Sequence, residues 1–199
     1  MKKDKMAIAF FVTGNVHKFH EARSVLSKFS IATAMLNIEA VEIQDDDIEI
    51  VAKTSARDAA HKSGLAVFVE DAGLFIKALN GFPGSYSSYV YRTIGTVGIL
   101  KLMKTLDKRD AYFQSVIAFF SPDERSEPLC FKGKVCGKIT CEERGKQGFG
   151  FDPIFEPIEA ENGQTFAQMT AEEKNNYSHR AHALRKFAEW YGPRFREKF

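Results

Sequence analysis

Cysteine is scarce in this chain, whose 199 residues contain only Cys130, Cys136 and Cys141. An odd number without CxxC spacing argues against both a disulfide framework and a zinc site. All three fall in one predicted strand region, where small buried thiols are the expected state. This cysteine usage fits a reducing compartment, and we expect a cytoplasmic location.

An excess of one charge is also missing. The chain has 28 basic and 26 acidic residues, which gives a net charge of +2. A charge this small produces no overall attraction to nucleic acid or to an anionic membrane. We therefore expect no stable nucleic-acid partner and no membrane association, and any anion site must be local.

Long hydrophobic runs are absent as well. The N-terminal stretch 1–15 has positive charge and a brief apolar run, which is too short to span a membrane and has no convincing cleavage site. We expect it to form the first strand and not a signal peptide. No repeat, linker or low-complexity segment interrupts the sequence, so residues 1–199 are expected to form one domain.

A complete P-loop pattern is lacking, but a simpler phosphate signal is present near the N-terminus. An apolar strand over 6–12 leads into Thr13, Gly14 and Asn15, and a helix then runs to about Phe29. This geometry points backbone N–H groups and a helix dipole at a phosphate, and Lys18 can add a full positive charge. The alternative is an ordinary strand-to-helix turn with a surface lysine.

Carboxylates occur where two predicted strands end. Glu70 and Asp71 follow the apolar run 66–69, and Glu42 comes near the end of a second strand within 31–43. Paired acids at a strand end suit a magnesium ion or a general base, because hard cations prefer oxygen ligands. The alternative is a solvated strand end followed by a hairpin.

The stretch 145–155 is rich in glycine and aromatic residues. Phe149 and Phe151 flank Gly150, and Asp152 closes the loop. Aromatic rings on such a loop can stack on a base, which contributes about 1–3 kcal/mol per base. Asp152 could accept hydrogen bonds from ring N–H groups. The alternative places both phenylalanines in the core.

Near the C-terminus, two cations stand at the start of a predicted helix. Ser178 can cap this helix, which puts His179 and Arg180 in its first turn. Cations are mildly unfavourable at that end of a helix, and such a violation often marks function. Lys174 lies just before, in a short helix that begins with the capping box 170–173.

The order of elements predicts an α/β fold with a mixed sheet. Strands alternate with helices in the first half, whereas short consecutive strands around 129–135 and 137–141 indicate an antiparallel section. Two lobes with a cleft between them follow from this change. Tyr86, Tyr89 and Tyr91 could form a dimer interface or pack in the core.

Five motifs in a fixed order resemble those of the inosine triphosphate pyrophosphatase family, whose members are also called XTP/dITP diphosphatases. The resemblance spans nearly the whole chain, and SSYVYRTIG at 87–95 is most similar to archaeal members. The motifs are TGNVHK (13–18), VEDAGL (69–74), ALNGFPGSYS (78–87), GFGFDPIF (148–155) and EEKNNYSHR (172–180).

The resemblance implies an elongated mixed β-sheet flanked by helices, with two lobes and a central nucleotide-binding cleft, in a homodimer. It implies Mg²⁺-dependent hydrolysis of the deaminated purine nucleotides ITP, dITP and XTP to the monophosphate and pyrophosphate. Such an enzyme would cleanse the nucleotide pool.

The resemblance also assigns roles to individual residues. Asp71 and Lys18 are the expected catalytic residues, with Asp71 as general base. The expected metal ligands are Glu42, Asp71 and Glu70. The expected substrate contacts are Thr13, Gly14, Asn15, Val16, His17, Lys18, Ala72, Phe149, Gly150, Phe151, Asp152, Lys174, His179 and Arg180.

Two positions depart from the family pattern. Ala72 stands where many members carry serine or threonine, so a hydroxyl contact to the nucleotide is lost. Ser55 stands where several members carry a lysine, and Lys53 is offset from it. The alternatives are a non-hydrolysing nucleotide sensor and a Maf-type pyrophosphatase of different base preference. A role in RNA binding fits poorly with the near-neutral charge.

Overall fold

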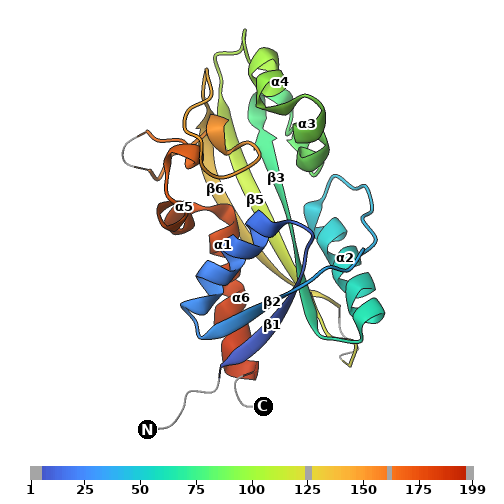
Figure 1. Cartoon of the computed structure of the whole chain (residues 1–199). Helices are drawn as coiled ribbons and strands as arrows, with labels where there is room; N and C mark the ends of the chain where they lie inside the picture. The colour runs from blue at the N-terminus through green and yellow to red at the C-terminus, as the bar shows by residue number, and fades with distance from the viewer. Residues whose placement is uncertain (1–5, 124–126, 161–162, 196–199) are drawn as a thin grey trace.

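One mixed sheet forms the backbone of the molecule in the computed structural model, which describes residues 6–123, 127–160 and 163–195 (Figure 1). The strand order is β2-β1-β3-β5-β6-β7, with β4 beside β3. The elements are β1 (Ala7–Val12), α1 (Val16–Ser27), β2 (Ile31–Leu36), α2 (Ile48–Ser63), β3 (Val67–Ile76), η1 (Lys77–Leu79), β4 (Pro83–Gly84), α3 (Ser87–Thr93), α4 (Gly95–Leu102), β5 (Asp110–Phe120), β6 (Leu129–Ile139), η2 (Asp152–Ile154), β7 (Phe155–Pro157), η3 (Phe166–Gln168), α5 (Ala171–Tyr177) and α6 (His179–Phe195).

The sheet confirms the predicted change from parallel to antiparallel pairing. β1 runs parallel to both β2 and β3, whereas β3, β5, β6 and β7 pair in antiparallel fashion. Residues 1–5 of the N-terminal run lie outside the described residues, and 7–12 form the first strand as expected.

An opening in the sheet lies along one edge of β3. On that edge β3 pairs with β1 only at Val67 and Phe68, and with β4 only at Leu74 and Phe75. The edge between these two contacts, residues 69–73, has no neighbouring strand in the described part of the chain. The opening therefore exposes the backbone around Glu70 to a space between the two ends of the molecule.

The strand at this opening is longer than the sequence predicted. We expected it to end at Val69, but β3 continues through the two carboxylates to Ile76 and pairs with β5 over its whole length. Successive side chains of a strand leave opposite faces of the sheet. Glu70 and Asp71 consequently point in different directions.

Two further expectations about local structure were wrong. Residues 129–139 form the single strand β6 instead of two strands. Residues 87–93, for which we had no secondary-structure prediction, form the helix α3. Cys136 and Cys141 are exposed, and Cys130 is half-buried; all three are free thiols. The cysteines on β6 alternate with residues of its buried face, which explains their exposure.

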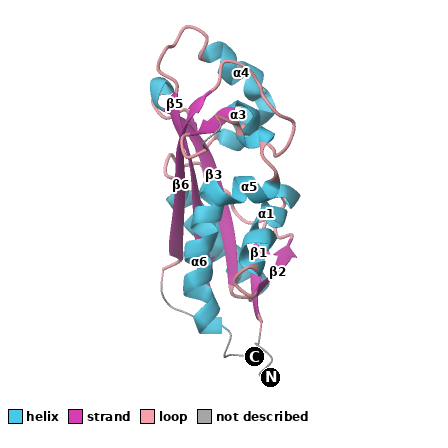
Figure 2. Cartoon of the chain, turned by 90° about the vertical axis from the view of Figure 1, so that its left-hand side faces the viewer, coloured by secondary structure: helices cyan, strands magenta, loops and turns pink. Residues whose placement is uncertain are grey.

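Helices cover the sheet differently at its two ends. In the end that contains β1 and β2, α1 and α6 pack on one face and α2 packs on the other. Figure 2 shows α6 running along the sheet, and Figure 1 shows α3 and α4 at the opposite end. That opposite end has its own core, built around Leu74, Ile99, Phe155 and Phe166. The buried residues at the β1–β2 end and those at the opposite end thus form the interiors of two lobes.

Gly133 on β6 sets how closely α6 approaches the sheet. A Cβ atom at this position would lie 1.9 Å from the carbonyl oxygen of His179 and 2.5 Å from the amide nitrogen of Ala183. Only glycine allows this contact, because real Cβ atoms do not come so near to backbone atoms. Separately, no helix among the described residues is both long and apolar enough to cross a membrane.

Candidate active site

A cleft of about 1940 Å³ occupies the opening beside β3. Its walls come from the start of α1, the loop 37–45, the α3 segment, the loop 149–152 and the start of α6. It brings together residues that are far apart in the sequence. All the predicted site residues line the cleft except Val16 and Lys174, and Lys174 contacts Asp152 from behind.

The turn before α1 is organised by its own side chains. The Oδ1 atom of Asn15 accepts hydrogen bonds from the N–H groups of His17 and Lys18, at 3.0 and 3.1 Å, and so caps the helix. Thr13 accepts a hydrogen bond from the N–H of Asn15 at 3.1 Å. Two of the helix's free N–H groups are thus already satisfied, which leaves fewer of them for an anion than the sequence suggested.

Glu70 is held by two cations and a hydroxyl group. Lys18 Nζ lies 3.0 Å from Oε2, Arg180 Nε lies 3.1 Å from Oε1, and Ser115 Oγ donates to Oε1 at 2.5 Å. The two ion pairs have poor hydrogen-bond angles, since Oε2 and Nε have no hydrogen-bond partner. Burial raises the pKa of Glu70, but the charges of Arg180 and Lys18 outweigh it and hold the pKa well below its usual range. Glu70 is therefore a buried counter-ion.

Asp71 faces a different environment. Burial, together with the charges of Glu70 and Glu42, raises its pKa to about 6 despite the opposing charge of Lys18. The carboxylate makes only a local hydrogen bond, from the N–H of Ala72 at 2.9 Å. Glu42 is exposed on the loop after β2 and not at a strand end, because β2 stops at Leu36. Asp71 thus keeps an oxygen available to a ligand.

A second buried network lies behind the loop 149–152. Lys174 Nζ lies 2.6 Å from Asp152 Oδ2 and 2.8 Å from Glu21 Oε1. Glu21 also binds Arg180, which links α1 to both α5 and α6. Burial raises the pKa of Asp152 in spite of Lys174. For Glu21 the charges of Arg180 and Lys174 outweigh burial, so its pKa is lowered.

The aromatic ring of Phe149 lies against the cations of this network. It stacks on the ring of His17 with centroids 5.2 Å apart and planes 17° apart. Lys174 Nζ lies 4.9 Å from the ring centre, and Arg180 Cζ lies 5.3 Å from it. Phe151 behaves differently: it is buried in the core and meets Tyr91 edge to face at 5.5 Å. Of the two predicted aromatic residues, Phe149 is the one placed to stack on a base.

His179 is a neutral imidazole inside the protein. Burial and the charge of Arg180 hold its pKa well below the usual value. Its ring stacks on Phe113 at 4.6 Å, and its Nδ1 atom is buried without a hydrogen-bond partner in the part of the chain that the structure describes. An unpartnered polar atom beside the cleft is a candidate contact for a ligand.

The sequence analysis missed three residues of this region. Glu21 bridges two cations, Ser115 holds Glu70, and Arg92 lines the cleft from α3. For Glu21 a signal existed, because it follows Lys18 by three positions and so shares the inward face of α1. Ser115 and Arg92 gave no such signal, since only the strand register and the unexpected helix α3 bring them to the site.

The charge of the cleft bears on whether a metal ion fits there. Its lining contains the six carboxylates Glu39, Glu42, Asp45, Glu70, Asp71 and Asp152, and the three cations Lys18, Arg92 and Arg180. A surface with this excess of negative charge repels an anion unless further cations enter. Within the described residues no three His, Cys, Asp or Glu side chains gather as a ready metal site. Magnesium does not need one, because it is commonly bound by one or two carboxylates together with substrate phosphates.

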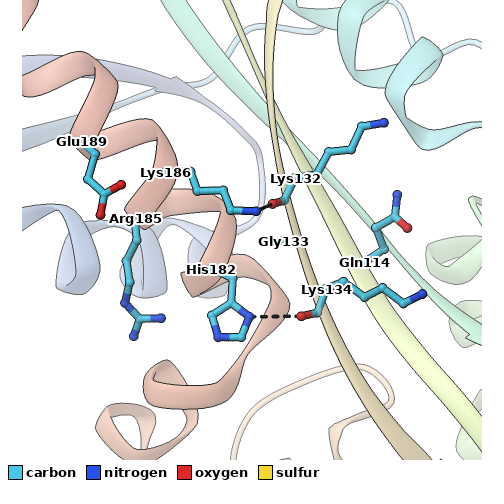
Figure 3. A pocket seen from close by; sticks show the side chains of 8 residues that line it. All are labelled: Gln114, Lys132, Gly133, Lys134, His182, Arg185, Lys186 and Glu189. Atoms are coloured by element: carbon cyan, nitrogen blue, oxygen red, sulfur yellow. Dashed lines mark hydrogen bonds between the residues drawn. The ribbon is translucent and has the colours of Figure 1, made fainter.

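A second hollow, of about 740 Å³, lies on the outer edge of β6 (Figure 3). His182 contacts the carbonyl oxygen of Lys134 at 3.1 Å, and Lys186 donates to that of Lys132 at 2.8 Å. The side chains of Lys132 and Lys134 extend to the other side of the strand, away from α6 (Figure 3). The cations around this hollow do not converge on one point, so the cleft beside β3 is the better candidate site.

Comparison with known proteins gives a consistent result. The model of the Ham1 family matches residues 9–190. A dITP/XTP pyrophosphatase of Methanopyrus kandleri is 48% identical over 181 residues, which cover 91% of this chain and 94% of that protein. One of Thermococcus kodakarensis is 48% identical over 180 residues, which cover 90% and 95% respectively.

Solved structures agree with these sequence matches. A HAM1 protein from Coxiella burnetii superposes with a TM-score of 0.79 at 31% identity and covers 93% of this chain and 98% of that one. A nucleoside-triphosphatase, or dITP/XTP pyrophosphatase, from Mycobacterium abscessus gives a TM-score of 0.69 at 28% identity, with coverage of 92% and 98%. The mixed sheet with its flanking helices is the fold of these proteins.

Proposed function

The chain belongs to the Ham1 family, and on this basis we propose that it hydrolyses the deaminated purine nucleotides dITP, XTP and ITP to the monophosphate and pyrophosphate. The observation that carries the proposal is the cleft beside β3. It combines a half-buried aspartate with a raised pKa, a stacking ring and buried cations, in a protein whose relatives are named for this activity. The reaction breaks the anhydride bond between the α- and β-phosphates.

Magnesium is the proposed cofactor. Glu42 and Asp71 would hold it, because both line the cleft and Asp71 has an oxygen free of strong partners. Glu70, the third predicted ligand, is engaged by Lys18 and Arg180 and serves to position them. When bound, the ion neutralises phosphate charge and draws electrons from the phosphorus that is attacked.

Asp71 is the proposed general base. A pKa of about 6 lies near the value that suits proton removal at neutral pH. In its ionised form Asp71 takes a proton from a water molecule as that water attacks, and pyrophosphate leaves. Lys18, held near the carboxylates of β3, places a positive charge beside the developing negative charge. The protein mainly positions the reactants and balances charge.

Recognition of the base is assigned to the loop 149–152 and the start of α6. Phe149 supplies the stacking surface. Both hydrogen bonds to Asp152 fall on Oδ2, so Oδ1 can accept from a ring N–H. Arg180 and His179 present donors to O6 of hypoxanthine or xanthine. The N6 amino group of adenine would meet these donors without an acceptor, which selects against ATP.

Assembly and location are inferred from exposed side chains and composition. We infer a homodimer that uses the exposed side chains of Tyr86, Tyr89 and Tyr91, since tyrosine is enriched at interfaces. The near-neutral charge and the free thiols support a cytoplasmic enzyme. The Maf-type alternative loses its basis, because the chain matches the Ham1 family model over most of its length.

Pyrophosphate release tests the proposal. We expect rapid release from ITP, dITP and XTP with Mg²⁺, slow release from GTP and ATP, and none after EDTA treatment. Equal rates with all five nucleotides would point to a broad pyrophosphatase. Tight ITP binding without any release would show a sensor in which the Ala72 departure has removed activity.

A further inference from the structure

Most cations around the cleft are already neutralised by the protein itself. Lys18 pairs with Glu70, and Arg180 pairs with both Glu70 and Glu21. Lys174, behind the cleft, pairs with Asp152 and Glu21. These cations can orient a substrate, but their charge is shared with a buried carboxylate. A triphosphate carries several negative charges, so its binding needs a cation whose charge is not already neutralised by a carboxylate of the protein.

Arg92 meets this requirement. It lies in the last turn of α3, is exposed and lines the cleft. Among the described residues it has no carboxylate, carbonyl or aromatic partner, unlike the other lysine and arginine residues of the lining. The helix α3, which carries Arg92, belongs to a different lobe from α1, which carries Lys18 (Figure 1), and both residues line the cleft. Polar side chains of the same segment, Ser85 and Ser88, line the cleft beside it.

We propose that Arg92 binds the triphosphate chain of the substrate from the α3 side of the cleft. The inference rests on the proposed function, because it assigns a residue to the phosphate end of the same substrate. Arginine presents several N–H donors in a planar fork that matches two phosphate oxygens at once. The cations that pair with protein carboxylates then bind other groups of the nucleotide. Arg92 supplies a positive charge that no carboxylate within the described ranges neutralises, and this charge attracts the polyphosphate.

Ser85 gives independent support for a ligand on this wall. Its Oγ atom is buried and has no hydrogen-bond partner among the described residues, although it lines the cleft. Buried hydroxyl groups are almost always bonded, so this atom is expected to bond to a ligand or water. Ser85 and Arg92 line the same cleft, so one ligand could contact both.

A purely structural role for Arg92 makes a different prediction. A cation in the last turn of a helix stabilises the helix slightly through its dipole. That role would affect stability by a small amount and would leave the kinetics unchanged. Kinetic measurement therefore separates the two roles.

The experiment compares Arg92→Ala and Arg92→Lys with wild type. Lys101→Ala is the matched control, since Lys101 is an exposed cation on the neighbouring helix α4 and does not line the cleft. Two quantities are measured with Mg²⁺: kcat/KM for ITP, and the dissociation constant of inorganic tripolyphosphate by calorimetry. For Arg92→Ala we expect kcat/KM to fall tenfold to a hundredfold and tripolyphosphate binding to weaken by a similar factor, roughly what loss of a charged hydrogen bond produces. Lysine should restore part of each, and the control should match wild type.

Two results would overturn the proposal: values within twofold of wild type for Arg92→Ala, or a loss of ITP turnover with unchanged tripolyphosphate binding. The second result would assign Arg92 to the ribose or base. If wild-type protein releases no pyrophosphate from any nucleotide, the proposed function fails, and calorimetry with tripolyphosphate still decides the role of Arg92.

Discussion

Glu70 and Asp71 are consecutive residues of β3, yet their side chains leave opposite faces of the strand and their pKa values shift in opposite directions. Glu70 is surrounded by Lys18, Arg180 and Ser115, which stabilise its charge. Asp71 is destabilised in its charged form mainly by burial, and the charges of Glu70 and Glu42 add to this effect. One strand thus supplies a structural anion and the proposed general base. Substitutions at the two positions are expected to have different consequences.

Asp71→Asn should abolish activity and stabilise the fold. Loss of a general base typically reduces kcat by about 10²–10⁴. The raised pKa of Asp71 means that its ionised form destabilises the folded state, fully above pH 6 and progressively less as the pH falls from 6 toward the ordinary pKa of 3.8. We expect a gain in the free energy of unfolding on the order of 1 kcal/mol at pH 8 without Mg²⁺, after allowance for solvent screening. Urea titration at pH 8 and pH 5 checks this, and an equal gain at both values would contradict it.

Glu70→Gln should instead destabilise the protein. It leaves Lys18 without this counter-ion and Arg180 with Glu21 as its remaining partner, and removal of one partner from a buried ion pair typically costs about 3–5 kcal/mol. Glu49→Gln is the control, because Glu49 pairs with Lys53 and Lys132 near the surface, where such pairs contribute about 1 kcal/mol or less. The measurement is urea unfolding at pH 7.5. Similar losses in the two variants would show that Glu70 is not a structural counter-ion.

Phe149→Ala should weaken binding of the base and spare binding of the phosphates. Stacking on one aromatic ring is worth about 1–3 kcal/mol, so KM for ITP should rise roughly tenfold to a hundredfold. Binding of inorganic tripolyphosphate should stay within twofold, and Phe149→Tyr should behave like wild type. A matching loss of tripolyphosphate binding would mean that the ring only supports Lys174 and Arg180, which lie against it.

His179 should make stability depend on pH. Its pKa is lowered in the folded protein, so below about pH 6.5 the unfolded chain binds a proton that the folded chain does not. The free energy of unfolding contributed by His179 therefore falls as the pH is lowered, by up to about 1.4 kcal/mol per pH unit. Asp71 acts in the opposite direction, so the test is the difference between wild type and His179→Gln at pH 7.5, 6.5 and 5.5. A difference that does not change with pH would contradict the prediction.

Much of the fold could be predicted because its signals are local. Apolar runs indicated β1 and β5, the capping box at 170–173 marked α5, and Ser178 marked the start of α6. The register of β3 could not be predicted, because its continuation past two acids depends on pairing with β5, a strand that is distant along the chain. The other edge of β5 pairs along nearly the whole of β6, which joins the two predicted halves of β6 into one strand.

The candidate site could likewise be predicted only where its signals were local. Sequence motifs located most residues of the cleft, but they did not reveal which residues bind one another. The link from Glu21 to Lys174 and Arg180 joins residues that are distant in the sequence, and it exists only when α1 packs beside α5 and α6. The separation of Glu70 from Asp71 was also hidden, because adjacent letters in a sequence do not reveal which face of a strand each side chain occupies.

Gly133, buried between β6 and α6, is linked through α6 to Arg180, the proposed base-reading residue. The missing side chain lets the first turn of α6 lie against β6, with the carbonyl of His179 over the glycine. The same turn carries Arg180 into the cleft. A methyl group added at position 133 would push this turn outward and shift the guanidinium relative to the purine. If Arg180 reads the base as proposed, a residue outside the cleft sets base preference, and engineering of base selectivity has a starting point at position 133.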